Sequence, residues 1–397
     1  MELKIDAAKW RRKRGVSRLL NALGADEGLT RYVGGAVRDE LLRLPHSDFD
    51  LATRLKPEDV IVRLETAKIR AIPTGIDHGT VTAVSSGHPF EITSLRRDVS
   101  TDGRRATVAF TDDWQEDAAR RDFTINALSA DPATGEIYDY FGGKEDLLAR
   151  RVRFIGDPLE RIAEDHLRIL RFFRFHARFG EGEPDAEALA ACTSRANDLM
   201  ALSRERIADE LLKLVAVDDP SPTMKVMIDR AILRPVIPEI DRPALTKLQS
   251  LVEAERKARM KLDPLRRLAA LLPRDPELSG RIASRLKLSN KARKRLACAA
   301  EEEIPDNVRE LAYYSGVECA VDRLLLAGKP DLALSVARWE PPKLPITGGM
   351  LIQRGLTQGP VVAKTLQAIE RQWVARDFPQ GAKFERIIDE ALVSSRG

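Results

Sequence analysis

Apolar residues along the chain follow two different spacings, and each spacing predicts a different kind of structure. Residues 1–23 carry apolar side chains at helical intervals and end at Gly24, which predicts a helix or a helix pair. Between about residues 29 and 140, short β-branched runs alternate with turn residues, as is typical of an α+β domain around a small sheet. Strands are expected at Leu29–Val33, Thr80–Ser85, Phe90–Ser94 and Ala106–Phe110, and helices at Ala36–Leu44 and Pro57–Ala67.

The spacing becomes helical almost throughout from Asp157 onward. Asp157 is a suitable N-cap, Pro158 takes the first helical position, and Glu160 completes a spacing like that of a capping box. Gly180 marks the expected end, so one long helix is predicted over residues 158–179. Pro- and Gly-containing breaks separate the later helices. The pattern therefore predicts a sheet-containing head followed by a long helical body.

Composition narrows the class of protein without identifying it. The chain has 397 residues, 43% hydrophobic and 32% charged, which indicates a folded protein of several domains. A net charge of +4 permits nucleic-acid binding only where Lys and Arg cluster. Three widely separated cysteines predict no disulfide framework and a reducing compartment. The sequence has no apolar run of membrane-spanning length and no signal-peptide core near its start, so we expect a cytoplasmic protein with no membrane contact.

The first motif that can carry chemistry is Gly34–Asp39, between a predicted strand and a predicted helix. Glycine allows backbone N–H groups to approach a ligand closely, and a helix N-terminus favours an anion. Arg38, on the first turn, can reach the same anion. A tight structural turn explains the two glycines equally well.

Three carboxylates form the second candidate group. In a strand, Asp48 and Asp50 point to the same side, where they repel each other unless a cation lies between them. Paired oxygen ligands suit Mg²⁺, and two-metal chemistry needs a third carboxylate, for which Glu91 is the candidate. The alternatives are a polar turn for the aspartates and a solvent-facing strand position for Glu91.

Two arginine-rich segments complete the set. Residues 120–127 place two adjacent arginines before an aspartate, and these cations can bind a triphosphate. In the predicted long helix, Asp165 and Arg168 are neighbours on one face, and Arg171 and Arg174 continue the three-residue step. A structural ion pair is the alternative in both segments.

Together these motifs resemble the class II CCA-adding enzymes, or tRNA nucleotidyltransferases, whose superfamily includes the bacterial poly(A) polymerases. The resemblance is dense over about residues 28–180 and weaker in the tail. It implies an α+β fold with an N-terminal nucleotidyltransferase (polymerase beta-like) head containing a small mixed sheet, followed by an all-helical neck, body and tail. The implied domains are a catalytic head at residues 1–140, a neck for base recognition at 141–225, and a tRNA-binding body and tail at 226–397.

The resemblance also implies an activity and roles for particular residues. The activity is stepwise, template-independent addition of C, C and A to the 3′ end of tRNA from CTP and ATP, with a two-ion Mg²⁺ site. The implied metal-binding residues are Asp48 and Asp50, and Glu91 helps to activate the 3′-hydroxyl. The implied nucleotide-binding residues are Gly35, Arg38, Arg121, Asp165, Arg168, Arg171 and Arg174.

The proposed base-reading pair has its own chemical logic. Cytosine and adenine both present an amino donor beside a ring acceptor, whereas uracil and guanine present the reverse order. An accepting aspartate beside a donating arginine therefore fits C and A. Each mismatched buried polar group costs roughly 1–3 kcal/mol, so U and G are rejected.

Two further segments are expected to take part in the activity, one by its resemblance to the family and one by its charge. The turn-rich stretch 96–107 resembles a mobile loop that helps to switch from C to A addition, and we expect it to be poorly ordered without substrate. Residues 281–295 concentrate basic side chains that can follow a tRNA backbone, or can simply form a solvated helix face. The basic residues are Arg281, Arg285, Lys287, Lys291, Arg293, Lys294 and Arg295.

Three alternatives remain open. A bacterial poly(A) polymerase shares the head, but the sequence after Glu91 lacks the expected Gly-Arg-Arg-Phe-like stretch and a long basic tail. A partial enzyme that adds only CC or only A fits the same motifs. A non-catalytic RNA-binding protein on this fold is disfavoured because all three carboxylates are present. No obligate protein partner is predicted.

Overall fold

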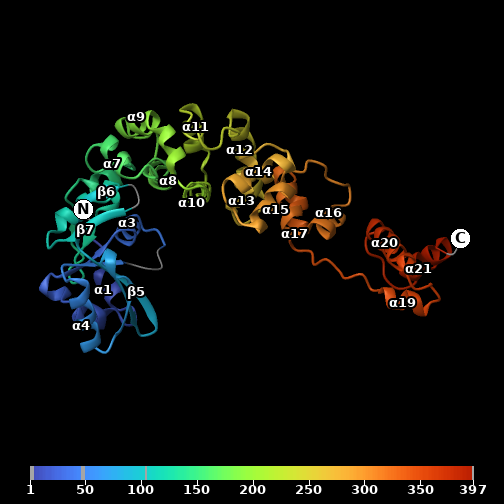
Figure 1. The fold of residues 1–397 in the computed structure, drawn as a ribbon, viewed down its shortest axis with the longest axis horizontal. Coiled ribbons are helices and arrows are strands. Elements are labelled where there is room, and N and C mark those ends of the chain that lie inside the picture. Colours follow the sequence, from blue (N-terminus) through green and yellow to red (C-terminus); the bar gives the residue numbers. More distant parts are fainter. Residues whose placement is uncertain (1–3, 46–49, 103–104, 396–397) are drawn as a thin grey trace. The chain divides into compact units, whose positions relative to one another are not determined.

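The computed structural model describes residues 4–45, 50–102 and 105–395, with side chains undescribed over residues 98–108. It divides into two compact units. The first holds Met1–Leu214 and Arg230–Val236, and the second holds Val215–Asp229 and Ile237–Gly397. An α+β region comes first and helices follow (Figure 1), as the sequence predicted. The three-domain division of the sequence stays a prediction.

A seven-stranded mixed sheet forms the centre of the α+β region. Its order is β3-β4-β5-β2-β1-β8-β9, and β2 and β5 run parallel while the other neighbours are antiparallel. The strands are β1 (Thr30–Val33), β2 (Asp50–Thr53), β3 (Arg70–Gly75), β4 (Thr80–Ser85), β5 (His88–Ser94), β8 (Ser129–Ala130) and β9 (Ile137–Tyr138). A separate hairpin pairs β6 (Arg96–Asp102) with β7 (Arg105–Phe110).

Short helices cover the sheet. Trp10 packs edge-on against Tyr32 of β1, with ring centroids 4.7 Å apart. In a separate hydrophobic cluster, Val33 of β1 and Ala52 of β2 pack with Trp114. The helices of this region are α1 (Ala7–Arg11), α2 (Val16–Ala22), α3 (Gly35–Leu41), α4 (Pro57–Thr66), α5 (Trp114–Ala119) and α6 (Gly143–Leu148), with 3₁₀ turns η1 (Ala25–Glu27), η2 (Ile76–His78) and η3 (Thr124–Asn126).

The helical segment of the first unit corrects one prediction. The expected single helix over 158–179 is two helices, because Asp165 has extended backbone angles (φ −152°, ψ 105°) and its Oδ1 accepts a hydrogen bond from Leu167 N. Asp157 does cap the first of them, accepting from Glu160 N at 3.0 Å. The elements are α7 (Pro158–Glu164), α8 (Arg168–Phe179), α9 (Ala186–Ser194), η4 (Ala196–Ala201) and α10 (Arg204–Val215).

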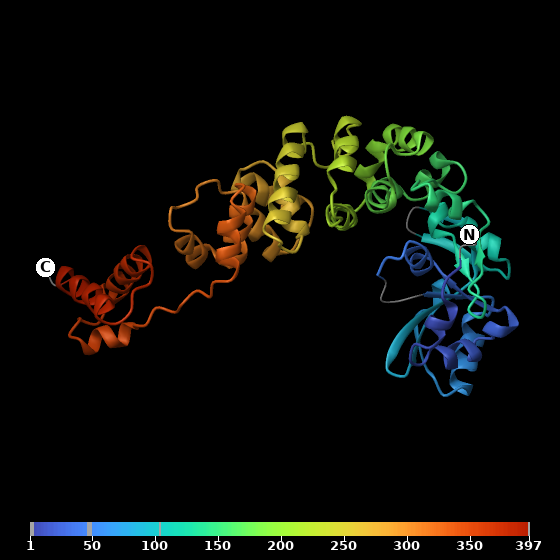
Figure 2. The same ribbon diagram turned by 180° about the vertical axis from the view of Figure 1, so that it is seen from behind.

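Helices make up the regular structure of the second unit over its described residues. Neighbouring helices in sequence pack together, notably α12 with α13, α14 with α15 and α17 with α18 (Figure 2, yellow to orange). The helices are α11 (Ser221–Asp229), α12 (Arg242–Lys257), α13 (Pro264–Leu271), α14 (Pro276–Arg285), α15 (Asn290–Ala299), α16 (Val308–Ser315), α17 (Val317–Leu326), α18 (Pro330–Ala337), α19 (Gly348–Gln353), α20 (Pro360–Ala375) and α21 (Ala382–Ser394).

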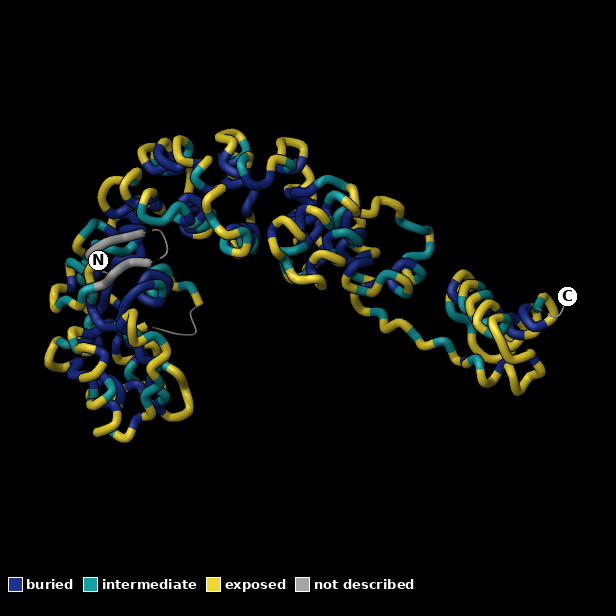
Figure 3. Tube along the Cα trace, viewed as in Figure 1, coloured by how far each residue is buried: buried dark blue, intermediate teal, exposed yellow. Residues whose placement is uncertain are grey.

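The last three helices have a hydrophobic core of their own. Trp373, Ile387 and Leu351 are buried together there. Before α19, residues 337–345 are exposed or half-buried, as Figure 3 shows by its yellow and teal tube. Tyr313 of α16 contacts Trp373 with ring centroids 5.9 Å apart, so this core is continued by a side chain from an earlier helix.

The cysteines correct a second prediction. Cys298 of α15 and Cys319 of α17 form a disulfide, with Cα atoms 6.2 Å apart, although no disulfide was expected. Their separation of 21 residues in sequence carries no pairing signal. The packing of α15 against α17 brings them together.

Candidate active site

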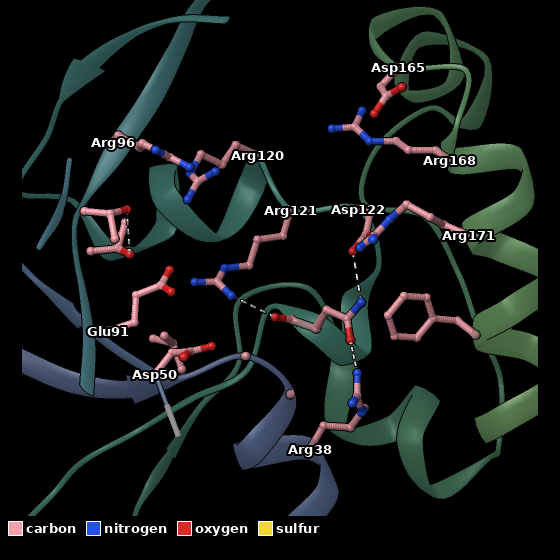
Figure 4. Close-up of a pocket in the computed structure, with 17 residues that line it drawn as sticks. Arg38, Asp50, Glu91, Arg96, Arg120, Arg121, Asp122, Asp165, Arg168 and Arg171 are labelled. Carbon is pink, nitrogen blue, oxygen red and sulfur yellow. Dashed lines mark hydrogen bonds and ion pairs between the residues drawn. The ribbon is translucent and has the colours of Figure 1, made fainter. Parts of the chain in front are cut away.

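A cavity of about 560 Å³ in the first unit collects most of the predicted site residues. Figure 4 shows Asp50 and Glu91 on one side and Asp165, Arg168 and Arg171 on the other. Gly34, Gly35, Arg38 and Arg121 also line it. Asp48 lies outside the described residues, so its predicted role as a metal ligand stays a prediction. Arg174 is not among the described residues that line the cavity.

The two carboxylates owe their proximity to the parallel pairing of β2 and β5. Leu51 is in register with Ile92, and both are fully buried. The preceding residues, Asp50 at the start of β2 and Glu91 in the middle of β5, therefore point away from that core, side by side on adjacent strands. Both residues line the cavity, and both are exposed. Their carboxylate oxygens are of the ligand type that Mg²⁺ prefers.

The glycine turn between β1 and α3 is required by backbone geometry and by close packing. Gly34 has φ +72°, a left-handed value that favours glycine. A Cβ at Gly35 would lie 3.2 Å from Nη2 of Arg38, and one at Gly34 would lie 3.4 Å from Nη1 of Arg121. The turn thus leaves room for two guanidinium groups at the cavity wall.

A buried carboxylate, Asp117, holds the adjacent arginines in place. Arg120 Nε donates to its Oδ1 at 2.9 Å, and Arg121 Nη2 donates to its Oδ2 at 3.3 Å. Burial works to raise the pKa of Asp117, but the two arginines outweigh it and hold the pKa below its usual range. The same Oδ1 accepts a hydrogen bond from the backbone N of Arg96, at the base of the β6–β7 hairpin.

A chain of hydrogen bonds joins the glycine-turn side of the cavity to α8. Arg38 Nη1 donates to Asn126 Oδ1, and Asn126 Nδ2 donates to Asp122 Oδ1 at 2.9 Å. Asp122 Oδ2 in turn accepts from Arg171 Nε at 2.8 Å. Burial works to raise the pKa of Asp122, but the charge of Arg171 and the hydrogen bonds lower it overall. Figure 4 shows these contacts as dashed lines.

The break between α7 and α8 orients the predicted base-reading pair. Asp165 Oδ2 accepts from Arg206 Nη2 of α10 at 2.7 Å. Arg168 Nη1 donates to the carbonyl of Arg161 at 2.7 Å and also to Glu164 Oε2. Both side chains still line the cavity. The acidic acceptor and the basic donor are thus each held by neighbouring protein groups.

Arg174 instead connects α8 to α10. Its Nε donates to Glu210 Oε2 at 2.6 Å, and its guanidinium lies 4.3 Å from the centroid of the Phe175 ring. Glu210 is 3% exposed. Because Arg206 and Glu210 are one turn apart on α10, that helix holds both Asp165 and Arg174.

Sequence reasoning missed the residues that orient others. Asp117, Asn126 and Arg206 were not singled out. Asn126 lies four residues after Asp122, a spacing that can indicate a local hydrogen bond. Arg206 is 41 residues from Asp165, and nothing in the spacing of the sequence links them.

The segment predicted to be a mobile loop has a regular backbone. Residues 96–102 and 105–110 pair as the antiparallel hairpin β6–β7, with a register shift between Asp98 and Ser100. Its predicted mobility stays a prediction.

The basic segment of the second unit is only partly available for a ligand. Arg295 donates to Asp322 at 2.6 Å and is largely buried, so its expected role at the surface is wrong. Arg281 pairs with Glu277, and Arg285 with Glu239. The remaining basic residues are exposed and make no ion pair within the described part of the chain: Lys287, Lys291, Arg293 and Lys294.

Comparison with protein families finds two matching profiles. One is described as the poly A polymerase head domain and matches residues 30–153. The other is described as a probable RNA and SrmB-binding site of polymerase A and matches residues 183–242. The first range contains the glycine turn, Asp50 and Glu91.

Curated relatives match along most of the chain. The mitochondrial CCA tRNA nucleotidyltransferase 1 of Mus musculus is 33% identical over 378 residues, which are 90% of this chain and 86% of the relative. The Homo sapiens protein of the same name is 34% identical, over 86% of this chain and 82% of the relative. The CCA-adding enzyme of Latilactobacillus sakei is 31% identical, over 88% of this chain and 90% of the relative.

Solved structures share the fold. The CCA-adding enzyme of Bacillus stearothermophilus in complex with CTP has a TM-score of 0.71 at 24% identity and covers 97% of this chain and 99% of that one. The Thermotoga maritima CCA-adding enzyme complexed with tRNA has a TM-score of 0.69 at 20% identity and covers 99% and 100%.

Proposed function

The chain belongs to the CCA tRNA nucleotidyltransferase family, and from that premise we propose that the cavity of the first unit is where this enzyme adds nucleotides to tRNA. The activity is template-independent addition of C, C and A to the tRNA 3′ end from CTP and ATP. One observation carries the assignment of the site. Two carboxylates on adjacent strands and a separately held Asp–Arg pair face the same cavity, with arginines between them.

The reaction joins the 3′-hydroxyl oxygen of tRNA to the α-phosphorus of the incoming nucleotide, and pyrophosphate leaves. In this proposal Glu91, which lines the cavity together with Asp50, accepts a hydrogen bond from the attacking hydroxyl. Arg38 and Arg121, together with the open backbone of the glycine turn, bind the triphosphate. In this arrangement the protein mainly positions the reactants and neutralises charge.

The donor set fits divalent metal. Asp50 and Glu91, with Asp48 as the predicted third ligand, would hold Mg²⁺ through carboxylate oxygens. Bound metal ions would supply charge neutralisation at the phosphate and a lower pKa for the attacking hydroxyl.

Base choice follows from the orientation of Asp165 and Arg168. The Arg206 contact fixes one carboxylate oxygen of Asp165, and the Glu164 and Arg161 contacts fix the guanidinium of Arg168. A fixed acceptor beside a fixed donor matches the Watson–Crick edge of C and of A. Uracil and guanine would leave both protein groups mispaired, at roughly 1–3 kcal/mol per group.

The other assignments extend this proposal to the rest of the chain. The head at 1–140 performs the chemistry, the neck at 141–225 reads the base, and the body and tail at 226–397 bind tRNA. No helix among the described residues is long and apolar enough to cross a membrane. The cytoplasmic location remains a prediction, and two of the relatives above are mitochondrial.

Nucleotide incorporation with substituted base-reading residues tests the site. A tRNA lacking its last three nucleotides is incubated with Mg²⁺ and with each of the four nucleoside triphosphates separately. The wild type should use CTP and exclude UTP and GTP. The Asp165→Ala, Arg168→Ala double variant should lose most of that preference, by about tenfold or more. If the double variant still excludes UTP and GTP, the base-reading assignment is wrong.

The same assay separates the alternative activities. A full CCA-adding enzyme uses CTP on tRNA ending before either C and uses ATP on tRNA that already ends in CC. A partial enzyme fails at one of these steps, and a poly(A) polymerase extends with ATP repeatedly. Activity without added Mg²⁺, after chelation, would contradict the metal assignment.

A further inference from the structure

The disulfide of the second unit joins the C-terminal end of one helix to the N-terminal end of another. Cys298 lies in the last turn of α15, and Cys319 is the third residue of α17, whose N-cap is Gly316. The third cysteine, Cys192 of α9, is fully buried and carries a free thiol. Burial raises the pKa of the Cys192 thiol, which keeps it unreactive.

The two bonded sulfurs differ in access. Cys298 is half-buried and lines a cavity of about 860 Å³ in the second unit. Cys319 is 6% exposed and is not among the described residues lining that cavity. Thiol–disulfide exchange requires the attacking thiolate to reach the sulfur that it bonds. Cys298 is therefore the sulfur that a small thiol reaches first.

The two sulfurs also differ as leaving groups. A thiolate in the first turn of a helix is stabilised by the backbone N–H groups, which favours departure of Cys319. Cys298 stands near the carbonyl end of α15, where a thiolate is disfavoured. Access and leaving-group stability thus point to the same direction of attack.

The cavity wall carries excess negative charge. Two arginines line it, and each has an acidic partner: Arg323 Nη1 donates to Glu301 at 2.6 Å, and Arg274 lies 3.9 Å from Glu302. Glu303 and Glu310 line the same cavity and leave a net charge of −2. A cleft lined by one sign of charge raises the association rate of ligands of the opposite charge and lowers that of ligands of the same charge.

We propose that this cavity is a thiol-exchange site at which a small cationic thiol reduces the Cys298–Cys319 disulfide. The thiolate sulfur bonds to Cys298 Sγ, the bond to Cys319 breaks, and Cys319 leaves as a thiolate that takes a proton from water. A second thiol attacks the mixed disulfide and releases Cys298. Two small thiols are oxidised to one disulfide, and the protein disulfide is reduced by the same two electrons.

The test compares cysteamine, a cationic thiol, with glutathione, an anionic one, on the full chain oxidised beforehand with oxidised dithiothreitol. Mixed disulfides are trapped with acid and mapped by peptide mass spectrometry. Rates on the urea-unfolded chain serve as the reference, because they cancel the intrinsic reactivity of each thiol. The native-to-unfolded rate ratio should be at least about tenfold higher for cysteamine at low salt, and high salt should reduce that difference.

Several results would overturn the proposal: failure of the two cysteines to oxidise, a mixed disulfide on Cys319, labelling of native Cys192 as fast as Cys298, or equal ratios for the two thiols. A charge variant, Glu302→Gln with Glu303→Gln, should reduce the cysteamine preference at least about threefold. Glu253→Gln with Glu390→Gln removes two exposed acids on α12 and α21 outside the cavity; this matched control should leave the cysteamine preference unchanged.

Two variants that each lack one of the bonded cysteines give a second, independent measure of how accessible each sulfur is. Cys319→Ser leaves the Cys298 thiol in the cavity, where a maleimide should label it quickly. Cys298→Ser leaves the buried Cys319 thiol, and maleimide labelling of that thiol should be at least about tenfold slower. Circular dichroism checks that both variants keep their helices. Equal labelling rates in folded variants would contradict the assigned asymmetry.

Discussion

Asp122 links two parts of the cavity wall through one buried carboxylate. It is 8% exposed, accepts from Asn126 on one oxygen and from Arg171 on the other, and so links the Arg38 side of the cavity to α8. Removing one partner of a buried ion pair leaves the other charge uncompensated, which costs more than the pair contributes when intact.

We therefore predict that Asp122→Asn destabilises the first unit by about 3 kcal/mol at pH 7. The pKa of Asp122 is lowered in the folded state, so its contribution is complete above the ordinary aspartate pKa of about 4 and is lost as the pH falls below it. The difference in stability between wild type and variant is measured at pH 7, 5 and 3.5 by urea unfolding, which is monitored by hydrogen exchange of the α8 amides.

The difference between wild type and variant should hold between pH 7 and 5 and narrow at pH 3.5. Asp209→Asn, an exposed aspartate paired with Lys213, is the control and should change stability by less than about 1 kcal/mol. A difference that grows on acidification would contradict the lowered pKa.

Individual site residues were predictable where the chemistry lies in a local pattern. Asp50, Glu91 and Arg121 could be proposed because their motifs are short and follow in order, and the structure brings all three to one cavity. Asp117 was missed although it precedes Arg120 and Arg121 by three and four residues, a helical spacing that can indicate an ion pair. Arg206 could not be proposed, because it orients Asp165 from a distant position in the sequence. A contact across 41 residues leaves no trace in local spacing.

At the scale of elements, the sequence predicted strands that carry alternating or β-branched runs. β4 was predicted at its observed bounds, since Val81 and Ala83 alternate with half-buried positions. The strands β8 and β9 have two residues each, too few to show a period. The α7–α8 break was missed because Glu164–Arg168 continues the helical spacing, whereas side-chain contacts to Asp165 stop the helix.

The helix α10 supports that break, and we predict that Arg206→Gln relaxes base choice. Without its Arg206 contact, Asp165 is free to turn away from the incoming base. The ratio of kcat/KM for UTP to that for CTP should rise by about tenfold, equivalent to about 1.4 kcal/mol. Single-nucleotide incorporation on tRNA measures it.

The control is Lys213→Gln on the same helix, an exposed lysine paired with Asp209. It should leave the ratio unchanged. If Arg206→Gln lowers the use of CTP and UTP equally, then Arg206 supports the site as a whole and does not position Asp165 for base selection.

At the scale of the whole molecule, a modest net charge of +4 conceals local concentrations of basic residues. The structure divides the expected basic segment into arginines held by acids and exposed side chains without such partners in the described part. Lys291 and Lys294 of α15 belong to the exposed group. Composition could indicate the segment, but only the fold shows which of its charges are available.

Lys291→Gln with Lys294→Gln should weaken tRNA binding and reduce the slope of log affinity against log salt by up to about 2, roughly one unit for each lost phosphate contact. Filter binding across a range of salt concentrations measures both. Lys56→Gln with Lys68→Gln removes the same charge from exposed positions in the first unit and should change the slope less. Equal slopes for the two double variants would contradict a tRNA surface on α15.

The central claim is that the carboxylates of Asp50 and Glu91, on the adjacent strands β2 and β5, drive addition of CCA to tRNA. Sequencing of the products formed on tRNA without its 3′ CCA, with CTP, ATP and Mg²⁺, tests it most directly for the wild type and for Asp50→Asn. The account predicts products ending in CCA for the wild type and a rate at least about 10²-fold lower for the variant. Products ending in a run of A, or an undiminished rate for Asp50→Asn, would contradict it.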